Sequence, residues 1–140
     1  MDYDKINGYL VDIFNNVVII EEASLKNSKF NDISLKEMHT IDVIGTHPDT
    51  TPSAVARELM LTLGTVTTSL NKLEKKGYII RTRSSVDRRV VHLSLSKKGR
   101  LVYRLHRAFH KSMVKTITEG FNDEELKVMS KGLENLHAFL

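Results

Sequence analysis

The feature that most constrains the fold is a run of helix start and stop signals between residues 34 and 77. Ser34 followed by Glu37 is a capping box, and Thr51-Pro52 supplies an N-cap and a proline at the first helical position. Thr62 can cap a further helix, which Gly77 ends. The signals predict short helices at about 35–45, 52–60 and 63–76. The last two meet at the short segment Met60-Leu61-Thr62, as in a helix-turn-helix.

A β-hairpin and long helices surround this motif. The β-branched runs at residues 78–83 and 90–95 predict two strands joined by a polar loop. Apolar residues at helical spacing predict an amphipathic helix over about 5–23. Ser96 caps a long helix that ends at Gly120, and we expect its apolar stripe to lie inside. Asn122 caps the last helix, which carries an apolar stripe of its own. The predicted fold is therefore mainly α with a small β-hairpin wing.

Length and composition exclude several classes of protein. The chain has 140 residues and no cysteine, which excludes disulfides, Cys-based zinc sites and thiol catalysis. Its start lacks a basic segment followed by an apolar stretch, and the longest aliphatic run is only Val17-Val18-Ile19-Ile20. We find no phosphate-binding glycine loop, no nucleophile elbow and no HExxH zinc motif. We expect a cytoplasmic protein without a cofactor or membrane partner, and not an enzyme.

Positive charge is concentrated in one stretch of the chain. Residues 72–111 hold 13 lysines and arginines but only two acids, Glu74 and Asp87, although the whole chain has a net charge of only +4. Such a segment is typical of a face that binds a polyanion, and the alternative is an ordinary solvated helix face.

The helix at 63–76 has a polar face suited to a DNA groove. Threonine methyls can contact thymine methyls, and an asparagine can pair with the N6 and N7 edge of adenine. Lysines at the far end would bind phosphates. The alternative is that these polar residues only keep a surface helix soluble, but threonine is a poor helix former. The predicted base-reading residues are Thr65, Thr67, Thr68 and Asn71, and the predicted phosphate-binding residues are Lys72 and Lys75.

The hairpin tip carries a second candidate DNA contact. Arg88 at the end of a two-stranded arm could enter an A/T-rich minor groove, and the neighbouring Asp87 could hold its guanidinium in place. We also assign Arg83 and Arg89 to the DNA-binding surface, where Arg89 would bind phosphate or brace the site. The alternative is an exposed turn with a weak surface ion pair.

The order and spacing of these blocks resemble the MarR family of winged-helix transcription regulators. The resemblance covers the whole chain, and its most specific parts are Thr65-Val66-Thr67, Leu73-Glu74-Lys75-Lys76-Gly77, Asp87-Arg88-Arg89 and Leu95-Ser96-Lys97-Lys98-Gly99. It implies a homodimer on double-stranded DNA. The implied DNA-binding domain is residues 33–96, and residues 1–32 and 97–140 would form a helical dimerisation region.

Other segments resemble a subgroup of the family that represses genes of type II fatty-acid synthesis. They are Ile13-Phe14-Asn15-Asn16-Val17, Leu35-Lys36-Glu37-Met38-His39-Thr40-Ile41, Leu63-Gly64-Thr65-Val66-Thr67 and Asp87-Arg88-Arg89-Val90-Val91. This resemblance implies a palindromic operator and a long-chain acyl-acyl carrier protein as corepressor.

The residues permit such a corepressor. An acidic carrier could dock on a cationic stripe of the long helix, formed by Arg100, Arg104, Arg107 and Lys111, although these side chains could equally lie over DNA phosphates or in solvent. An acyl chain needs an apolar slot, for which the candidates are Phe14, Val18, Met38, Ile41, Leu105, Phe109 and Met113. Ordinary core packing is the alternative role of each.

Three histidines leave a different ligand open. His106 and His110 are i, i+4 neighbours, and His39 lies on a helix that the family's fold would bring close. With a carboxylate such as Glu22 they could bind zinc, as in zinc-sensing members of the family, or they could be surface residues. A further alternative is an architectural DNA binder without a ligand, which would show little sequence preference.

Overall fold

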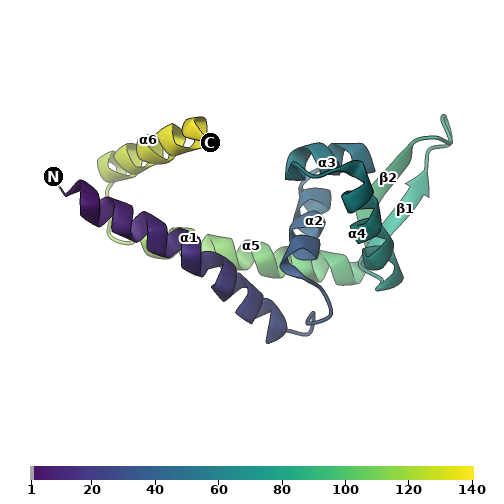
Figure 1. Cartoon of the computed structure of the whole chain (residues 1–140), viewed down its shortest axis with the longest axis horizontal. Coiled ribbons are helices and arrows are strands. Elements are labelled where there is room, and N and C mark those ends of the chain that lie inside the picture. Colours follow the sequence, from purple (N-terminus) through teal and green to yellow (C-terminus); the bar gives the residue numbers. More distant parts are fainter. Residues whose placement is uncertain (1) are drawn as a thin grey trace. The chain divides into compact units, whose positions relative to one another are not determined.

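The structure, a computed structural model, describes residues 2–140 as two compact units, one ending at Arg104 and the other covering Leu105–Leu140. The first unit contains α1 (Tyr3–Lys26), α2 (Leu35–Thr46), α3 (Pro52–Leu59), α4 (Leu63–Lys75), β1 (Ile79–Arg83), β2 (Val91–Leu95) and the start of α5 (Lys97–Ile117) (Figure 1). The second contains the rest of α5 and α6 (Asp123–Phe139). Within residues 2–140, no helix has an apolar stretch long enough to cross a membrane.

The predicted N-caps start the helices of the first unit. The Ser34 hydroxyl accepts a hydrogen bond from the Glu37 N–H, and the Glu37 carboxylate accepts one from the Ser34 N–H, which completes the capping box of α2. Thr51 and Thr62 cap α3 and α4 in the same way, through the N–H groups of the third residues that follow. The predicted starts of α2, α3 and α4 are therefore confirmed.

The turn between α3 and α4 confirms the helix-turn-helix. Met60 ends α3 in the left-handed conformation, with φ of 56°, and Gly77 follows α4 with φ of 84°. Only glycine adopts the second conformation at no steric cost, which explains why the stop signal at Gly77 was readable from the sequence.

The hairpin forms as predicted, with each strand one residue shorter. β1 pairs antiparallel with β2 in a register that places Ile79 opposite Leu95 and Arg83 opposite Val91. Figure 1 shows the hairpin projecting away from α2, α3 and α4. Residues 84–90 form the loop at its tip, and we call the hairpin with this loop the wing.

The core of the first unit lies between the helix-turn-helix and the base of the wing. Its most deeply buried aliphatic side chains come from α2, α3, α4, β2 and α5, and they are Ile41, Val55, Val66, Leu70, Leu73, Leu93 and Val102. Burial of this apolar surface is the main force that fixes α4 against the wing. The opposite face of α4 is thereby held toward solvent.

A polar cluster fastens the loop before α2 to the base of the wing. The buried Tyr78 hydroxyl donates a hydrogen bond to Asp32, and the Lys98 ammonium lies 4.3 Å from the centre of the Tyr78 ring. Lys76 donates to the Asp32 carbonyl and lies 3.3 Å from Glu37. Burial and the hydrogen bond to Asp32 raise the pKa of Tyr78, so the phenol remains a donor.

The apolar stripes of the long helices are not inside the single chain. The sequence predicted that the apolar stripe of α5 would be interior, yet Leu101, Leu105 and Ile117 of that stripe are exposed, and no residue of α6 is buried. On α1, Phe14 is 59% exposed. The prediction is wrong for the single chain because a long helix needs neighbours along its whole length to bury a stripe. Apolar surface of this extent is typical of a face that another molecule covers.

Candidate DNA-binding surface

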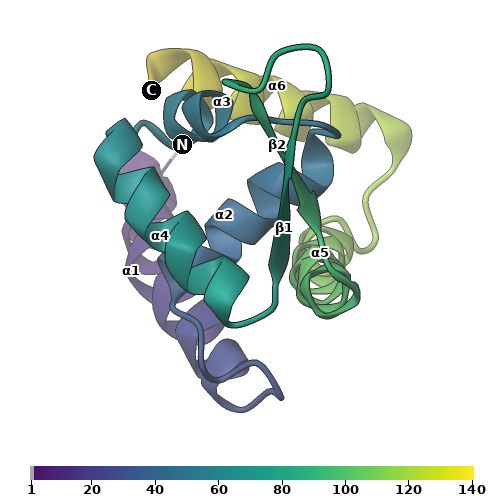
Figure 2. The same cartoon turned by 90° about the vertical axis from the view of Figure 1, so that its right-hand side faces the viewer.

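The outward face of α4 consists of the side chains that the sequence assigned to DNA. Val66, Leu70 and Leu73 point into the core, each no more than 1% exposed. The predicted contact residues on the other side are all exposed: Thr65, Thr67, Thr68, Asn71, Lys72 and Lys75. In Figure 2 α4 and the wing both face the viewer, so the two predicted DNA-contacting elements belong to one side of this unit.

The threonine hydroxyls of this face are engaged by their own helix. Thr67 donates its hydroxyl proton to the Leu63 carbonyl at 2.8 Å, and Thr68 donates to the Gly64 carbonyl at 3.1 Å. A hydroxyl that has donated its proton can still accept a hydrogen bond, and its methyl group stays exposed. Thr67 and Thr68 therefore offer a methyl and an acceptor to a base edge, which suits a thymine methyl or an exocyclic amino group.

Asn71 has a partner that sequence reasoning missed. The Arg81 guanidinium of β1 donates a hydrogen bond to the Asn71 side-chain oxygen at 2.8 Å, and the same nitrogen lies 3.7 Å from the Glu74 carboxylate. The alternation of side chains along β1 could have shown that Arg81 points inward, because Arg81 is two residues from the buried Ile79 and shares its face.

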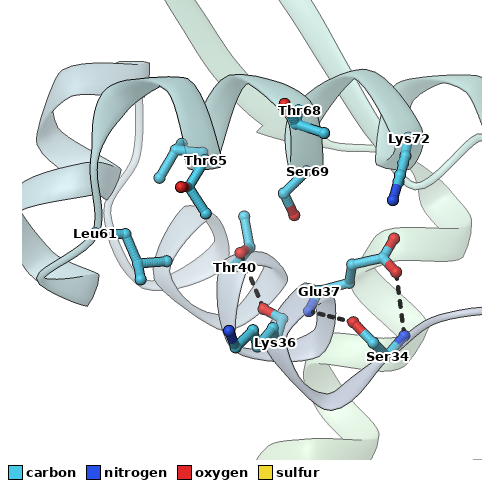
Figure 3. A pocket seen from close by; sticks show the side chains of 10 residues that line it. Ser34, Lys36, Glu37, Thr40, Leu61, Thr65, Thr68, Ser69 and Lys72 are labelled. Atoms are coloured by element: carbon cyan, nitrogen blue, oxygen red, sulfur yellow. Dashed lines mark hydrogen bonds between the residues drawn. The ribbon is translucent and has the colours of Figure 1, made fainter.

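A hollow of about 340 Å³ opens beside this face, between α2 and α4. In Figure 3, Thr65, Thr68, Ser69 and Lys72 of α4 line one side of it. The N-cap residue Ser34 and Lys36, Glu37 and Thr40 of α2 line the other. Hydroxyls and lysines are groups that bind phosphate oxygens. The hollow thus extends the polar surface of α4 toward the start of α2.

At the wing tip the acid holds a different arginine from the one expected. Asp87 accepts hydrogen bonds from the Arg89 backbone N–H at 3.0 Å and from the Arg89 guanidinium at 3.2 and 3.3 Å. These bonds hold the pKa of the exposed Asp87 carboxyl below its ordinary value. The expectation that Asp87 holds Arg88 is therefore wrong. Arg88 is exposed, and its carbonyl accepts a hydrogen bond from the Arg83 guanidinium at 2.9 Å.

Comparisons with known proteins place this arrangement in a family. The sequence model of the MarR family matches residues 33–91. The chain is 33% identical to the HTH-type transcriptional regulator YwhA of Bacillus subtilis over 107 residues. These residues are 71% of this chain and 73% of that protein. The crystal structure of Streptococcus pneumoniae FabT in complex with DNA has 66% sequence identity and a TM-score of 0.90, over 99% of this chain and 96% of that one. The chain belongs to the MarR family.

Membership of the MarR family makes the chain a DNA-binding transcriptional regulator with a winged helix, and not an enzyme. The regulator PchR of Bacillus subtilis is 30% identical over 110 residues, which are 76% of this chain and 65% of that protein. A MarR family protein from Bacillus stearothermophilus, at 21% identity and a TM-score of 0.77, shares the fold.

The residues proposed for a MarR effector lie in both units. Met38 and Ile41 belong to the core of the first unit, whereas Phe14 and Val18 are exposed on α1. The second unit carries Leu105, which is exposed, and the half-buried Phe109 and Met113. Of the four candidates in the first unit, Met38 and Ile41 are therefore core residues, and Phe14 and Val18 are surface residues.

The predicted cationic stripe of α5 also divides between the units. Arg100 and Arg104 belong to the first, where they line a hollow of about 400 Å³ with Tyr103 and Gly45. Arg100 also donates to the Leu95 carbonyl at 3.1 Å. The other members, Arg107 and Lys111, are exposed in the second unit.

Of the three histidines considered as zinc ligands, His39 forms an ion pair, and His106 and His110 pack ring against ring. His39 of the first unit lies 3.5 Å from the buried carboxylate of Glu21, and Glu22, the acid named from the sequence, is exposed. His106 and His110 of the second unit stack edge to face, with ring centres 4.5 Å apart. The acid that pairs with His39 is therefore Glu21, the sequence neighbour of the one expected.

Proposed function

We propose that this MarR-family regulator is a sequence-specific repressor of fatty-acid biosynthesis genes that binds an A/T-rich palindrome as a homodimer. The observation that carries the proposal is the 66% identity, over nearly the whole chain, to an S. pneumoniae FabT that was crystallised with DNA. The two α4 helices would enter successive major grooves about 10 base pairs apart, and the wings would enter the flanking minor grooves.

The chemistry of the surface supports this assignment. Thr65, Thr67, Thr68 and Asn71 would contact bases, and Lys72 and Lys75 would contact phosphates. Arg88 is the wing residue that we assign to the minor groove, because Arg89 is engaged by Asp87. Arg83 would brace the wing through its bond to the Arg88 carbonyl.

The open apolar stripes support the homodimer. Large aliphatic and aromatic side chains are exposed along α1 and at positions of α5 and α6, among them Ile6, Ile13, Phe14, Leu105, Ile117 and Leu133. A second copy of the chain could cover this surface, and each Å² of apolar area removed from water would stabilise the dimer by about 25 cal/mol. The proposed dimerisation region is residues 1–32 and 97–140, and the proposed DNA-binding domain is residues 33–96.

We further propose a long-chain acyl-acyl carrier protein as corepressor. The support is the likeness to FabT together with the charge of α5, since Arg100, Arg104, Arg107 and Lys111 suit an acidic carrier. The acyl chain would lie against some of the apolar residues named above. A corepressor must bind the DNA-competent arrangement of the dimer more tightly than the other arrangements.

A binding titration tests both parts of the proposal. Fluorescence anisotropy would follow a labelled A/T-rich palindrome and a scrambled duplex of equal composition at several salt concentrations. We expect the palindrome to bind more tightly at every salt concentration, whereas equal affinities would identify a purely electrostatic binder. Palmitoyl-acyl carrier protein should then tighten palindrome binding, with the unacylated carrier as control. An unchanged affinity at saturation would remove the corepressor and leave the DNA proposal standing.

A second candidate function is zinc-responsive regulation. The pairing of His106 with His110 on one helix favours it, because imidazoles one helical turn apart are a common start of a zinc site. Elemental analysis after dialysis, first against zinc and then against a chelator, tests this candidate. Stoichiometric zinc that His106→Gln removes would support it, and protein without zinc would end it.

A further inference from the structure

Arg81 is an unusual residue for its position in the wing. It stands in the middle of β1 opposite Leu93, a core residue that is 1% exposed, and its own side chain is only 25% exposed. Residues that stand opposite each other in an antiparallel pair share a face, so the Arg81 stem follows the inner side of the hairpin toward α4. A guanidinium that has lost most of its contact with water needs a hydrogen-bonding partner to replace it.

The partner of Arg81 is the side-chain amide of Asn71. One guanidinium nitrogen donates to the Asn71 oxygen at 2.8 Å, and Glu74, one turn further along α4, lies 3.7 Å from that nitrogen and supplies the balancing charge. A hydrogen bond from a charged donor is about twice as strong as a neutral one. Because only the oxygen of a carboxamide can accept such a bond, Arg81 selects one of the two amide orientations.

We propose that Arg81 is a positioning residue that determines what Asn71 reads in DNA. By holding the amide oxygen toward β1, Arg81 presents the amide N–H groups to the major groove. Asn71 then favours base edges that carry an acceptor and rejects cytosine. This inference rests on the proposed function, in which α4 enters the major groove.

The rejection of cytosine follows from the hydrogen-bonding groups that each base presents in the major groove. In the major groove, guanine offers N7 and O6, adenine offers N7, and thymine offers O4, all of which accept a hydrogen bond from an amide N–H. Cytosine offers only its N4 amino group, which needs an acceptor. An asparagine free to turn could supply its oxygen to cytosine, but Asn71 gives that oxygen to Arg81.

The same geometry alters the adenine contact expected from the sequence. A bidentate asparagine–adenine pair uses the amide oxygen for N6 and the amide nitrogen for N7. With the oxygen engaged by Arg81, the N7 contact is the dominant one. Because guanine also carries N7, Asn71 should discriminate purine from cytosine more strongly than adenine from guanine.

Selection from a DNA pool tests the proposal. The probe is a fluorescent pool of duplexes with a randomised palindrome, from which the wild type, Asn71→Ala, Arg81→Met and Arg83→Met each select bound sequences. The base pair whose preference disappears in Asn71→Ala is the Asn71-dependent pair. Dissociation constants are then measured on four duplexes that differ only at that pair. Arg83→Met is the matched control, since it removes the same charge from the same face of the same strand.

We expect Arg81→Met to reduce the wild-type discrimination against cytosine by about fivefold, the value of one hydrogen bond. Arg81→Gln should do the same, and it provides a second variant if the methionine variant fails to fold. Arg83→Met should weaken all four duplexes alike and keep the discrimination. In the Asn71→Ala background, Arg81→Met should change no base preference.

Three results would overturn the inference. The first is cytosine discrimination that persists in both Arg81 variants. The second is an equal loss on all duplexes with a salt slope reduced by about one, which would make Arg81 a phosphate contact. The third is an effect of Arg81→Met on base preference without Asn71, which would make Arg81 itself the reader. A wild type that selects no sequence would instead refute the proposed function.

Discussion

Tyr78→Phe removes one hydroxyl from the polar cluster at the base of the wing and leaves the rest of the side chain in place. The phenyl ring can keep its packing in the core, its edge contact with Phe30 and the Lys98 ammonium over its face. The variant loses the hydrogen bond to Asp32. It therefore isolates the contribution of that bond to the stability of the folded chain.

The expected cost follows from the exposure of the acceptor. A hydrogen bond to a charged group contributes about 1.5–3 kcal/mol. The Asp32 side chain is 45% exposed, so water replaces part of the lost interaction and screens the rest. We expect the free energy of unfolding to fall by about 1–2 kcal/mol at pH 7, which in urea lowers the midpoint by roughly 0.5–1 M.

The effect should depend on pH with a definite sign. The Tyr78 hydrogen bond lowers the pKa of Asp32 in the folded chain; burial opposes this shift, and Lys98 adds to it. Stability linked to a lowered carboxyl pKa is complete above the unfolded pKa and disappears as the pH falls through the folded pKa. The difference between wild type and Tyr78→Phe should therefore shrink in acid.

Urea unfolding followed by circular dichroism measures this difference at pH 7 and at pH 3, at one protein concentration because unfolding can be linked to dimer dissociation. Asp32→Asn and the double variant complete a mutant cycle, in which the coupling between Tyr78 and Asp32 should carry most of the loss. Equal midpoints for wild type and Tyr78→Phe at pH 7 would refute the argument. So would a difference that is the same at both pH values.

Four further substitutions have expected outcomes. Gly99→Ala should cost about 2 kcal/mol in urea unfolding, because a Cβ at Gly99 would overlap the Tyr78 carbonyl oxygen, which belongs to the backbone and cannot rotate away. Gly64→Ala, where an added Cβ has no neighbour within 4 Å, should instead stabilise α4 by about 0.5–1 kcal/mol. In the anisotropy assay, Asn71→Ala should weaken the preferred palindrome by about 1–3 kcal/mol and relax its sequence preference. Lys75→Ala should weaken every duplex alike and reduce the salt slope by about one.

The parts of the fold that the sequence predicted are those decided by short-range contacts. The capping bonds of Ser34, Thr51 and Thr62 join residues three positions apart, so the local sequence contains both partners. The same holds for the inward stripe of α4, which repeats every three or four residues. Helix and strand boundaries could therefore be predicted to within a few residues. The side of α4 that faces solvent could be predicted for the same reason.

The DNA-binding side chains were found by type, but their partners were not. Arg81 lies ten residues from Asn71 and meets it only because β1 packs beside α4, so no local pattern pairs them.

At the wing tip the backbone decides the partner of Asp87. The Asp87 side chain accepts the Arg89 N–H two residues on, as in an Asx turn, which brings the Arg89 guanidinium to the same carboxylate. Arg88 occupies the corner of that turn and is exposed. The arginine that is held and the arginine that is presented are thus separate residues. The presented one can enter a groove without breaking the ion pair that shapes the tip.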